Sequence, residues 1–572
     1  MGWGFVAEDP EFADLCERMG LRFIGPPADV IRRLSDKVAA KSLAEEAGLT
    51  VADWSRGPVA SVDEARSHAE RIGSPVMVKA AMGHGGQGVA AVSEPGALEA
   101  VYLGLRDGAG RVFGDDRVFL ERVIAGARCI EVDVVVDDHG VAWSPGLRDC
   151  SLQRRSRKLI EESGSPVLDP GRQEEIRRAA VELMVRAGYR NAGTVEFLHQ
   201  PEDGGLYFTE VNPRLQVGHA VTEATAGLDL VKLQLHVAMG GGLEPDPPVE
   251  RGHAVEVRIN AQDAERGFAT AAGELELLAL PTGPGIRVDT GLSEGDVIPP
   301  DYDALIAKVV AWGRDRDESF ARLRRAVGEM AVVVRGGATN RSLLLDLLDR
   351  PEVVDGTADI GWIDRLDQAE GLVSERGADI ALIEAAINTY DHEEAIARDA
   401  FYASARRGRP KAPPPVGASI RLHRRGQGYA FSVSRTAPSR YRLTVDGSTV
   451  VADVERLGRF GAYMHIGDRR HRVVTVSNDP DHVVEVAGVA HRIARDEGRL
   501  VRAPAPSLVV SVAPSVGDEL REGDPVAVLE SMKMETAVPA PFDGVVREVL
   551  VAGNVQVDAG APLAVSYTHL RA

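Results

Sequence analysis

The sequence predicts a multidomain chain of α/β and β regions, and three observations carry this prediction. Helix-like and strand-like apolar patterns alternate up to about residue 363, as they do in layered α/β folds. Between Ile420 and Ile493 the apolar period becomes two, which is typical of half-buried strands. Near the C-terminus two β-like halves repeat at an offset of about 36 residues, which indicates a flattened β-sandwich.

Composition is that of a globular protein and limits its partners. The chain has 572 residues, room for three to four domains. Its formal net charge of −20 argues against nucleic acid or an anionic membrane as a partner. Cys16, Cys129 and Cys150 match no metal-ligand spacing, which favours a reducing compartment. No long apolar run or signal-peptide pattern occurs, so we expect a soluble cytoplasmic protein.

The α/β region contains a loop suited to phosphate. Residues 36–48 and 173–188 have amphipathic patterns and are predicted helices, and Val76 to Lys79 is a short apolar strand. Lys79 can place a point charge on a phosphate. The glycines that follow let backbone N–H groups approach a polyanion: Gly83, Gly85, Gly86 and Gly88. A flexible turn would show the same glycines, so the loop alone leaves both interpretations open.

Two acidic residues stand on strands that we expect to be neighbours. Glu196 lies in an apolar segment, and Glu210 precedes Asn212 in the next one. Two carboxylates and an amide oxygen suit Mg²⁺, which prefers hard oxygen ligands. Solvated or salt-bridged strand residues would give the same pattern. An earlier strand, 119–123, could supply an edge for adenine.

The middle region predicts a helix followed by a β-meander. Residues 378–405 have a helical apolar pattern, and a proline-rich linker, 407–415, follows. The clearest strands are 429–433, 441–445, 471–474 and 482–486, and Asp446-Gly447 is a good turn dipeptide. Any small β-barrel would show this pattern.

The C-terminal region places one lysine at a special position. Residues 505–528 and 540–565 are the two β-like halves, and Glu530 to Thr536 join them in a predicted hairpin. Lys533 lies between Met532 and Met534 at the tip of that hairpin. An ordinary solvated lysine is the plainest alternative.

This Met-Lys-Met turn within a pseudo-repeat resembles the biotinyl carrier domain of biotin-dependent carboxylases. The resemblance implies biotin in amide linkage to Lys533. A lipoyl carrier has the same fold but typically has Asp before its lysine and Ala after it. The helix and meander resemble the small docking domain of acyl-CoA carboxylases, a β-barrel around a central helix.

The α/β region resembles the ATP-grasp biotin carboxylase component of acyl-CoA carboxylases. The segments that carry this resemblance are 2–5, 23–26, 36–41, 79–88, 148–155, 252–261 and 302–303. The implied domains are a carboxylase over 1–364 with a lid at about 51–123, a docking domain over 365–500, a carrier over 501–565, and a non-native tail over 566–572.

The resemblance also assigns roles to matching positions. The expected ATP contacts are Lys37, Lys79, Gly83, Gly85, Gly86, Gly88, Glu121, Val123 and Gln153. The expected ligands of Mg²⁺ or Mn²⁺ are Glu196 and Glu210, with Asn212 close by. The residues expected around bicarbonate are Lys158, Arg214, Gln216 and Val217, and Arg287 is expected to stabilise carboxyphosphate and the biotin enolate.

The implied reaction is the ATP- and bicarbonate-dependent carboxylation of biotin on Lys533. A carboxyltransferase outside this sequence would pass the carboxyl group to an acetyl- or propionyl-type acyl-CoA, and biotin protein ligase would load the lysine. These partners imply a multi-subunit complex. The alternatives are a carrier and docking module with an inactive carboxylase region, and, more remotely, another ATP-grasp ligase that carries a lipoyl domain.

The chain departs from the family pattern in four places. About eighty residues usually precede the Gly2-Trp3-Gly4-Phe5 segment, so we expect an N-terminal truncation. Gly218 stands where the family has the glutamate expected to act as general base, a function typically worth ~10²–10⁴-fold in rate. Cys129 and Ser156 stand where histidine is frequent. The residues after Val565 do not continue the strand pattern.

Overall fold

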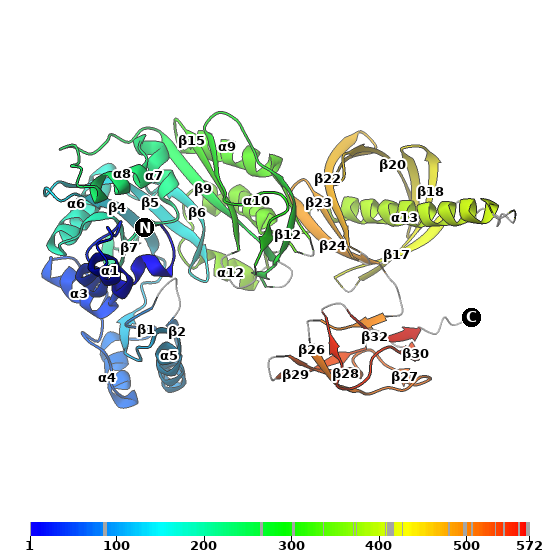
Figure 1. The fold of residues 1–572 in the computed structure, drawn as a ribbon, viewed down its shortest axis with the longest axis horizontal. Helices are drawn as coiled ribbons and strands as arrows, with labels where there is room; N and C mark the ends of the chain where they lie inside the picture. The colour runs from blue at the N-terminus through cyan, green and yellow to red at the C-terminus, as the bar shows by residue number, and fades with distance from the viewer. Residues whose placement is uncertain are drawn as a thin grey trace. The chain divides into compact units, whose positions relative to one another are not determined.

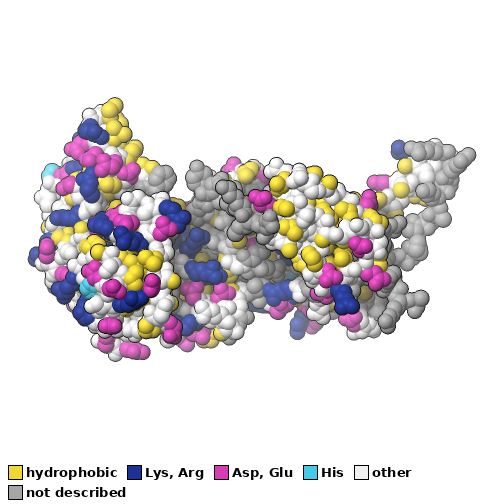
Figure 2. All heavy atoms as spheres, turned by 90° about the horizontal axis from the view of Figure 1, so that it is seen from below, with side chains coloured by type: hydrophobic (Ala, Val, Ile, Leu, Met, Phe, Trp, Pro, Cys, Tyr) yellow, Lys and Arg dark blue, Asp and Glu magenta, His cyan; other side chains and the backbone are white. Residues whose placement is uncertain are grey.

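The computed structural model divides into two compact units, Met1–Glu375 and Arg376–Ala572 (Figure 1). The described residues are 2–83, 88–263, 267–299, 304–335, 337–369, 371–372, 374–406, 408, 417–425, 427–478, 481–495, 500–504, 507–531, 534–540, 544–558 and 561–567. On the face shown in Figure 2, basic and acidic side chains are interspersed rather than gathered by sign.

An eight-stranded antiparallel sheet forms the centre of the first unit. In spatial order its strands are β13 (Ile286–Asp289), β15 (Leu305–Gly313), β9 (His253–Asn260), β6 (Arg157–Ser163), β5 (Ala142–Arg154), β4 (Arg128–Val136), β7 (Asn191–Gln200) and β8 (Gly205–Asn212).

Helices bury the apolar side of this sheet at its β4–β8 end. Alternate residues of β4, among them Ile130 and Val132, join the core that α2 (Ala28–Ser35), α3 (Lys37–Glu46) and α6 (Pro170–Arg186) complete. The residues between them, Glu131 and Asp133, face the opposite side. On that side α7 (His219–Ala226) packs on β5, β6 and β9.

The predicted helices of this region are present. α3 begins after Asp36, whose carboxylate accepts the N–H groups of Val38 and Ala39, and it ends just before Gly48 at φ 81°. α6 begins at Pro170, three residues earlier than expected, because Asp169 caps it. The remaining helices at this end are η1 (Phe5–Glu8), α1 (Pro10–Arg18) and α8 (Leu230–Ala238).

The C-terminal part of the first unit packs against β9 and β15. Its apolar core contains residues of α9 (Arg316–Glu329), α10 (Arg341–Asp349), α11 (Pro351–Val354) and α12 (Trp362–Ala369). A small sheet, β14 (Val297–Ile298), β12 (Gly273–Ala279) and β16 (Ala331–Val334), and a two-stranded one, β10 (Gln262–Asp263) and β11 (Ala269–Thr270), complete it.

A separate three-stranded sheet lies within the predicted lid. Its order is β2 (Val89–Val92), β1 (Val76–Ala80), β3 (Val118–Arg122). One face packs on α4 (Val62–Ile72) and α5 (Leu98–Phe113), the latter preceded by η2 (Pro95–Ala97). Lys79 and Glu121 pair with each other on the other face, since strand side chains alternate.

The second unit begins with a helix enclosed by a closed β-barrel, as the sequence predicted. Buried residues of the first half of α13 (Ala378–Arg406) share one core with the barrel strands. The barrel strands are β17 (Ala418–Arg424), β18 (Gln427–Ala437), β19 (Arg440–Val445), β20 (Ser448–Leu457), β21 (Gly461–Ile466), β22 (Arg469–Asn478), β23 (Asp481–Val486) and β24 (Val489–Arg495). Asp446 and Gly447, both at positive φ, turn β19 into β20.

The last region is a sandwich of two four-stranded sheets, which confirms the predicted flattened fold. One sheet contains β25 (Leu500–Arg502), β32 (Pro562–Tyr567), β30 (Gly544–Val549) and β27 (Glu519–Leu520). The other contains β29 (Met534–Pro539), β28 (Pro525–Ser531), β26 (Ser507–Val512) and β31 (Gln556–Val557).

The predicted end of the last strand was wrong by two residues. β32 continues to Tyr567, which pairs with Val545, while Ser566 pairs with Val546. Backbone pairing does not require the apolar alternation on which the prediction relied. Residues 568–572 of the expected tail lie outside the described residues.

No helix within the described ranges is long and apolar enough to cross a membrane.

Candidate functional site

A row of ionisable side chains crosses the large sheet, one on each strand. Strand register places Glu131 opposite Glu196 and Arg148, and Glu161 opposite Glu256. From β8 to β13 the row contains Glu210, Glu196, Glu131, Arg148, Glu161, Glu256, Lys308 and Asp289. Two predicted site residues, Glu196 and Glu210, belong to this row, and three others, Lys158, Gln216 and Arg287, contact members of it.

The predicted metal ligands lie at the β7–β8 end of this row. Glu196 and Glu210 are directly opposite each other on neighbouring strands. Lys37 pairs with Glu210, while Glu196 Oε1 accepts hydrogen bonds from Lys158 Nζ at 3.0 Å and Asn212 Nδ2 at 2.8 Å. Burial raises the pKa of Glu196 above its ordinary value although Lys158 opposes the shift.

The lysines predicted to bind ATP are near this end. The backbone N–H of Lys37 donates to the carbonyl of Ala81, directly after β1. Lys79 and the buried Lys41 both pair with Glu121, with Lys41 Nζ 2.7 Å from Glu121 Oε2. Burial alone would raise the pKa of Glu121, but the two lysines outweigh it and lower it to about 2. Glu121 therefore carries a full negative charge between two cations.

The glycine-rich loop is described only at its two ends, Gly83 and Gly88, since Gly85 and Gly86 lie outside the described residues. Gly88 has φ 71°, and its carbonyl accepts the N–H of Ala80 at 2.8 Å. A Cβ at this position would lie 2.9 Å from the Ala80 Cβ and 3.1 Å from the Phe113 ring. Glycine is therefore required here on both conformational and steric grounds.

The two remaining expected nucleotide contacts, Val123 and Gln153, lie directly after β3 and on β5. Val123 follows β3, and its N–H donates to the carbonyl of Pro75 at 3.3 Å. Gln153 is half-buried on β5 and lies opposite Lys158 on β6.

The residues expected around bicarbonate form one connected group. Lys158 pairs with Glu131, which also accepts from Gln216 Nε2 at 2.8 Å. Arg214 Nη1 donates to Gln216 Oε1 at 2.9 Å. Burial works against ionisation of Glu131, but Lys158 and Arg148 hold its pKa well below the usual range.

Val217 and Arg287 lie beside the other end of the row. Lys308 Nζ donates to the Val217 carbonyl at 2.9 Å and lies 3.3 Å from Asp289 Oδ2. Arg287 donates to the same Asp289 at 2.8 Å and to Glu223 on α7 at 2.6 Å. The predicted bicarbonate and biotin residues are thus joined through Lys308 and Asp289.

The family departures have distinct surroundings. Cys129 Sγ is 2.8 Å from Cys150 Sγ and 4.0 Å from Glu196 Oε2, so the substituted position borders the carboxylates. Ser156 lies in the β5–β6 turn at φ 61°. Gly218 directly precedes α7, next to Glu161.

Lys533 lies outside the described residues. The strands on either side are described: β28 ends at Ser531, β29 begins at Met534, and these two residues are paired. The second unit therefore has the antiparallel pair predicted to flank the lysine.

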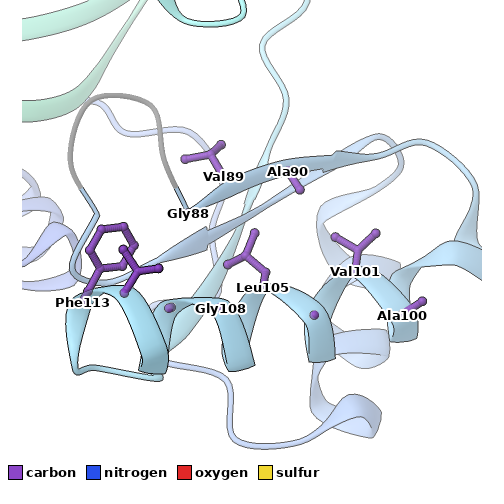
Figure 3. A pocket seen from close by; sticks show the side chains of 11 residues that line it. Gly88, Val89, Ala90, Ala100, Val101, Leu105, Gly108 and Phe113 are labelled. Carbon is purple, nitrogen blue, oxygen red and sulfur yellow. The ribbon is translucent and has the colours of Figure 1, made fainter. Parts of the chain in front are cut away.

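An apolar hollow of about 660 Å³ lies on the lid between α5 and β2, and it does not belong to this row (Figure 3). Its lining includes Gly88, Val89, Leu105 and Phe113, and among the described residues no titratable side chain contributes to it. The described lining therefore offers no group for acid–base or phosphate chemistry.

Sequence reasoning missed several members of the site. They are Lys41, Glu131, Arg148, Glu161, Glu223, Glu256, Asp289 and Lys308, together with Glu8, which pairs with Arg214. Glu131 and Asp133 alternate with isoleucine and valine in a strand that is otherwise apolar. Charges at alternate positions of such a strand signal a polar cluster on one face, so this pair could have been found from the sequence.

Family comparisons match most of the chain. Residues 36–245 match the carbamoyl-phosphate synthase L chain ATP-binding domain, and 256–365 match the biotin carboxylase C-terminal domain. Residues 486–565 match the family described as biotin-requiring enzyme, and 1–31 match the biotin carboxylase N-terminal domain. The match over 486–565 begins in the barrel, before the sandwich itself.

Individual proteins similar to this chain are biotin carboxylases or subunits of biotin-dependent carboxylases. The biotin carboxylase of Pseudomonas aeruginosa is 41% identical over 64% of this chain and 81% of its own length. The mitochondrial methylcrotonoyl-CoA carboxylase subunit alpha of Arabidopsis thaliana is 32% identical over 98% of this chain and 84% of its own length. The biotin carboxylase domain of Hydrogenobacter thermophilus 2-oxoglutarate carboxylase, solved with MgADP, ADP and bicarbonate, is 36% identical, with a TM-score of 0.62 over 64% of this chain and 81% of that one.

The fold of the first unit and its row of charges define an ATP-grasp ligase. The chain belongs to the biotin-dependent carboxylases and joins a biotin carboxylase to a biotinyl domain. Its chemistry is the ATP-dependent carboxylation of biotin, and its cofactors are biotin, ATP and Mg²⁺.

Proposed function

We propose that this chain carboxylates biotin on its own Lys533 and supplies the carboxyl group to an acyl-CoA through a carboxyltransferase on another polypeptide. The observation that carries the proposal is the connected group around Lys158, Glu196 and Gln216, which lies in the same chain as the biotinyl sandwich. The methylcrotonoyl-CoA carboxylase α subunits, similar over nearly the whole chain, support an acyl-CoA as acceptor.

The carboxylate pair fits a divalent cation. Glu196 and Glu210 are directly opposite on antiparallel strands, so their Cβ atoms are about 5 Å apart, and Asn212 adds an amide oxygen. In the described part of the chain no cluster of three His, Cys, Asp or Glu side chains is placed to hold a metal. Mg²⁺ suits a site with few protein ligands because it retains waters and binds nucleotide phosphates. When bound, it would neutralise charge on the phosphates.

The side chains of this unit would position the reactants. Lys37 and Lys79 would hold the ATP phosphates, with Gly83 and Gly88 at the ends of the covering loop, Val123 at adenine and Gln153 near the ribose. Bicarbonate is a poor nucleophile, so Lys158, Arg214, Gln216 and Val217 would fix it beside the γ-phosphoryl group. Arg287 would stabilise negative charge where the carboxyl group is released.

The experiment uses purified full-length chain loaded by biotin protein ligase. Bicarbonate-dependent ADP formation with free biotin tests the first unit. Transfer of labelled bicarbonate into the chain, compared between wild type and Lys533→Ala, tests loading in cis. The reasoning fails if ADP formation does not depend on bicarbonate, or if Lys533→Ala takes up label as the wild type does.

The alternative function is a carrier and docking module with an inactive carboxylase region, and Gly218 is the observation that favours it. It predicts streptavidin-detectable biotin on Lys533 but no bicarbonate-dependent ADP formation.

The acceptor can be identified by adding a purified carboxyltransferase and testing acetyl-, propionyl- and methylcrotonoyl-CoA in turn. We also propose a cytoplasmic location, supported by the three cysteines, none of which forms a disulfide.

A further inference from the structure

A carboxylate occupies the space that a side chain at position 218 would need. A Cβ built on Gly218 would overlap Glu161 Oε2 and lie 2.8 Å from Glu161 Cδ. Gly218 follows Gln216 and Val217, the segment proposed to bind bicarbonate. The carboxylate of Glu161 therefore lies where the side chain of a glutamate at position 218 would begin.

Glu161 and Glu256 form an unusual buried pair. They are directly opposite on β6 and β9 and are 1% and 0% exposed. Among the described residues, three of their four carboxylate oxygens accept no hydrogen bond: Glu161 Oε2 and both oxygens of Glu256. Buried structural carboxylates normally have hydrogen-bond partners because leaving an oxygen without one is costly.

The nearby cations do not fully neutralise the negative charge of Glu161 and Glu256. Arg258 pairs with Glu161 but is 3.6 Å from Glu256, and Lys308 is 3.8 Å from Glu256. Arg148, 3.5 Å from Glu161 Oε2, already donates to Glu131 and Asp133. Burial raises the pKa of Glu256 to about 7, so Glu256 can hold a proton close to neutral pH.

Lys308 connects the pair to the proposed bicarbonate segment. Its ammonium donates to the Val217 carbonyl and lies within ion-pair distance of Glu256. Lys308 thus links Glu256 to Val217, while Glu161 lies directly beside Gly218. A carboxylate beside Gly218 can accept a proton in place of the glutamate that the family has at position 218.

We propose that Glu161 is the catalytic base that takes the proton of bicarbonate, directly or through one water, with Glu256 as its partner. This assignment rests on the function proposed above. In the step, the bicarbonate O–H bond breaks and its proton moves to Glu161 Oε2. The freed oxygen bonds to the γ-phosphorus of ATP, and ADP leaves with the electron pair of the broken bridging bond.

The test measures bicarbonate-dependent ADP formation with free biotin in the full-length chain. Glu161→Gln should lower kcat by about 10²–10⁴-fold and remove the acid limb of its pH profile. MgATP affinity, measured by calorimetry, should stay within about threefold because no assigned nucleotide contact changes.

Glu162→Gln is the matched control. Glu162 is the next residue on β6 and is equally buried, but it pairs with Arg316 at 2.6 Å and His253 at 3.2 Å on the other face of the sheet. This control should keep kcat within about threefold of wild type, the range that a group outside the chemistry allows. The double variant Glu161→Ala with Gly218→Glu should recover activity and an acid limb, since it returns one base to the same place.

Two outcomes would overturn the assignment while leaving the proposed function intact: an active Glu161→Gln variant, or equal losses in Glu161→Gln and Glu162→Gln. A double variant as inactive as Glu161→Ala would also overturn it. Wild type without bicarbonate-dependent turnover would refute the proposed function and this assignment together.

Discussion

Replacing Gly218 by alanine should destabilise the first unit because of Glu161. The added Cβ would overlap Glu161 Oε2, and that carboxylate, 1% exposed, is held by Arg258. Glu161 must turn away or the backbone before α7 must shift. Overpacking typically costs about 1–3 kcal/mol, and separating a buried ion pair costs about 3–5 kcal/mol. If the chain overpacks in part and the Glu161–Arg258 pair separates in part, the free energy of unfolding should fall by about 3 kcal/mol.

Thermal unfolding of the full-length chain can measure this loss. The first unit spans residues 1–375, so an unfolding entropy of about 2.1 cal/mol/K per residue converts 3 kcal/mol into a midpoint shift of about 4 °C. Gly291→Ala is the matched control, since a Cβ there meets no atom within 4 Å. It should leave the midpoint unchanged within about 0.5 °C, as expected for a surface site.

A double-mutant cycle isolates the cause. In a Glu161→Ala background the same glycine substitution should cost almost nothing, which gives a coupling of about 2–3 kcal/mol for side chains in contact. An equal cost in both backgrounds would show that the strain lies in the backbone and not in the carboxylate. A Gly218→Ala midpoint equal to that of wild type would refute the packing itself.

Three further predictions concern buried charged side chains. Burial lowers the pKa of Lys37 to about 8, so MgATP binding at pH 8 should take up about half a proton as phosphate favours the charged form; heats that do not depend on the buffer would contradict this, and Lys37→Met should abolish the uptake. Lys41→Met leaves Glu121 short of a buried partner and should cost about 3–5 kcal/mol in urea unfolding, whereas a loss below 1 kcal/mol would argue against the pair. In the barrel, Glu384 of α13 is 0% exposed and pairs with Arg456, so Glu384→Ala should lower the midpoint of the second unit alone.

The sequence was most informative where local pattern decides structure. The Lys79 strand and its glycines, the Asp446-Gly447 turn and the helix from residue 378 all depend on neighbours within a few positions. The structure has the strand as β1 and the helix as α13, each within one residue of the predicted end, and it has the turn at Asp446 and Gly447. The sandwich was equally accessible, since its halves repeat in order along the chain.

Contacts between distant strands could not be predicted in this way. Glu161 and Glu256 are opposite each other because β6 and β9 are neighbours in the sheet, although 95 positions separate the two residues. No local period specifies that register. Arg287 was predicted as a functional cation, but its pairing with Glu223 depends on how α7 packs near β13. The individual residues were therefore easier to select than their partners.

The row of charges lies along one face of the antiparallel sheet. Strand register and ion pairs together bring one charged residue from each strand into line, so an eight-stranded sheet can hold reactants along its width without a loop for each contact. Burying such a row costs stability unless opposite charges alternate. They alternate around Arg148 and Lys308, but Glu131, Glu196 and Glu210 are three like charges in succession, and Glu161 and Glu256 are a like-charged pair. A bound cation would relieve the repulsion within the first group, and a bound proton would relieve it within the second.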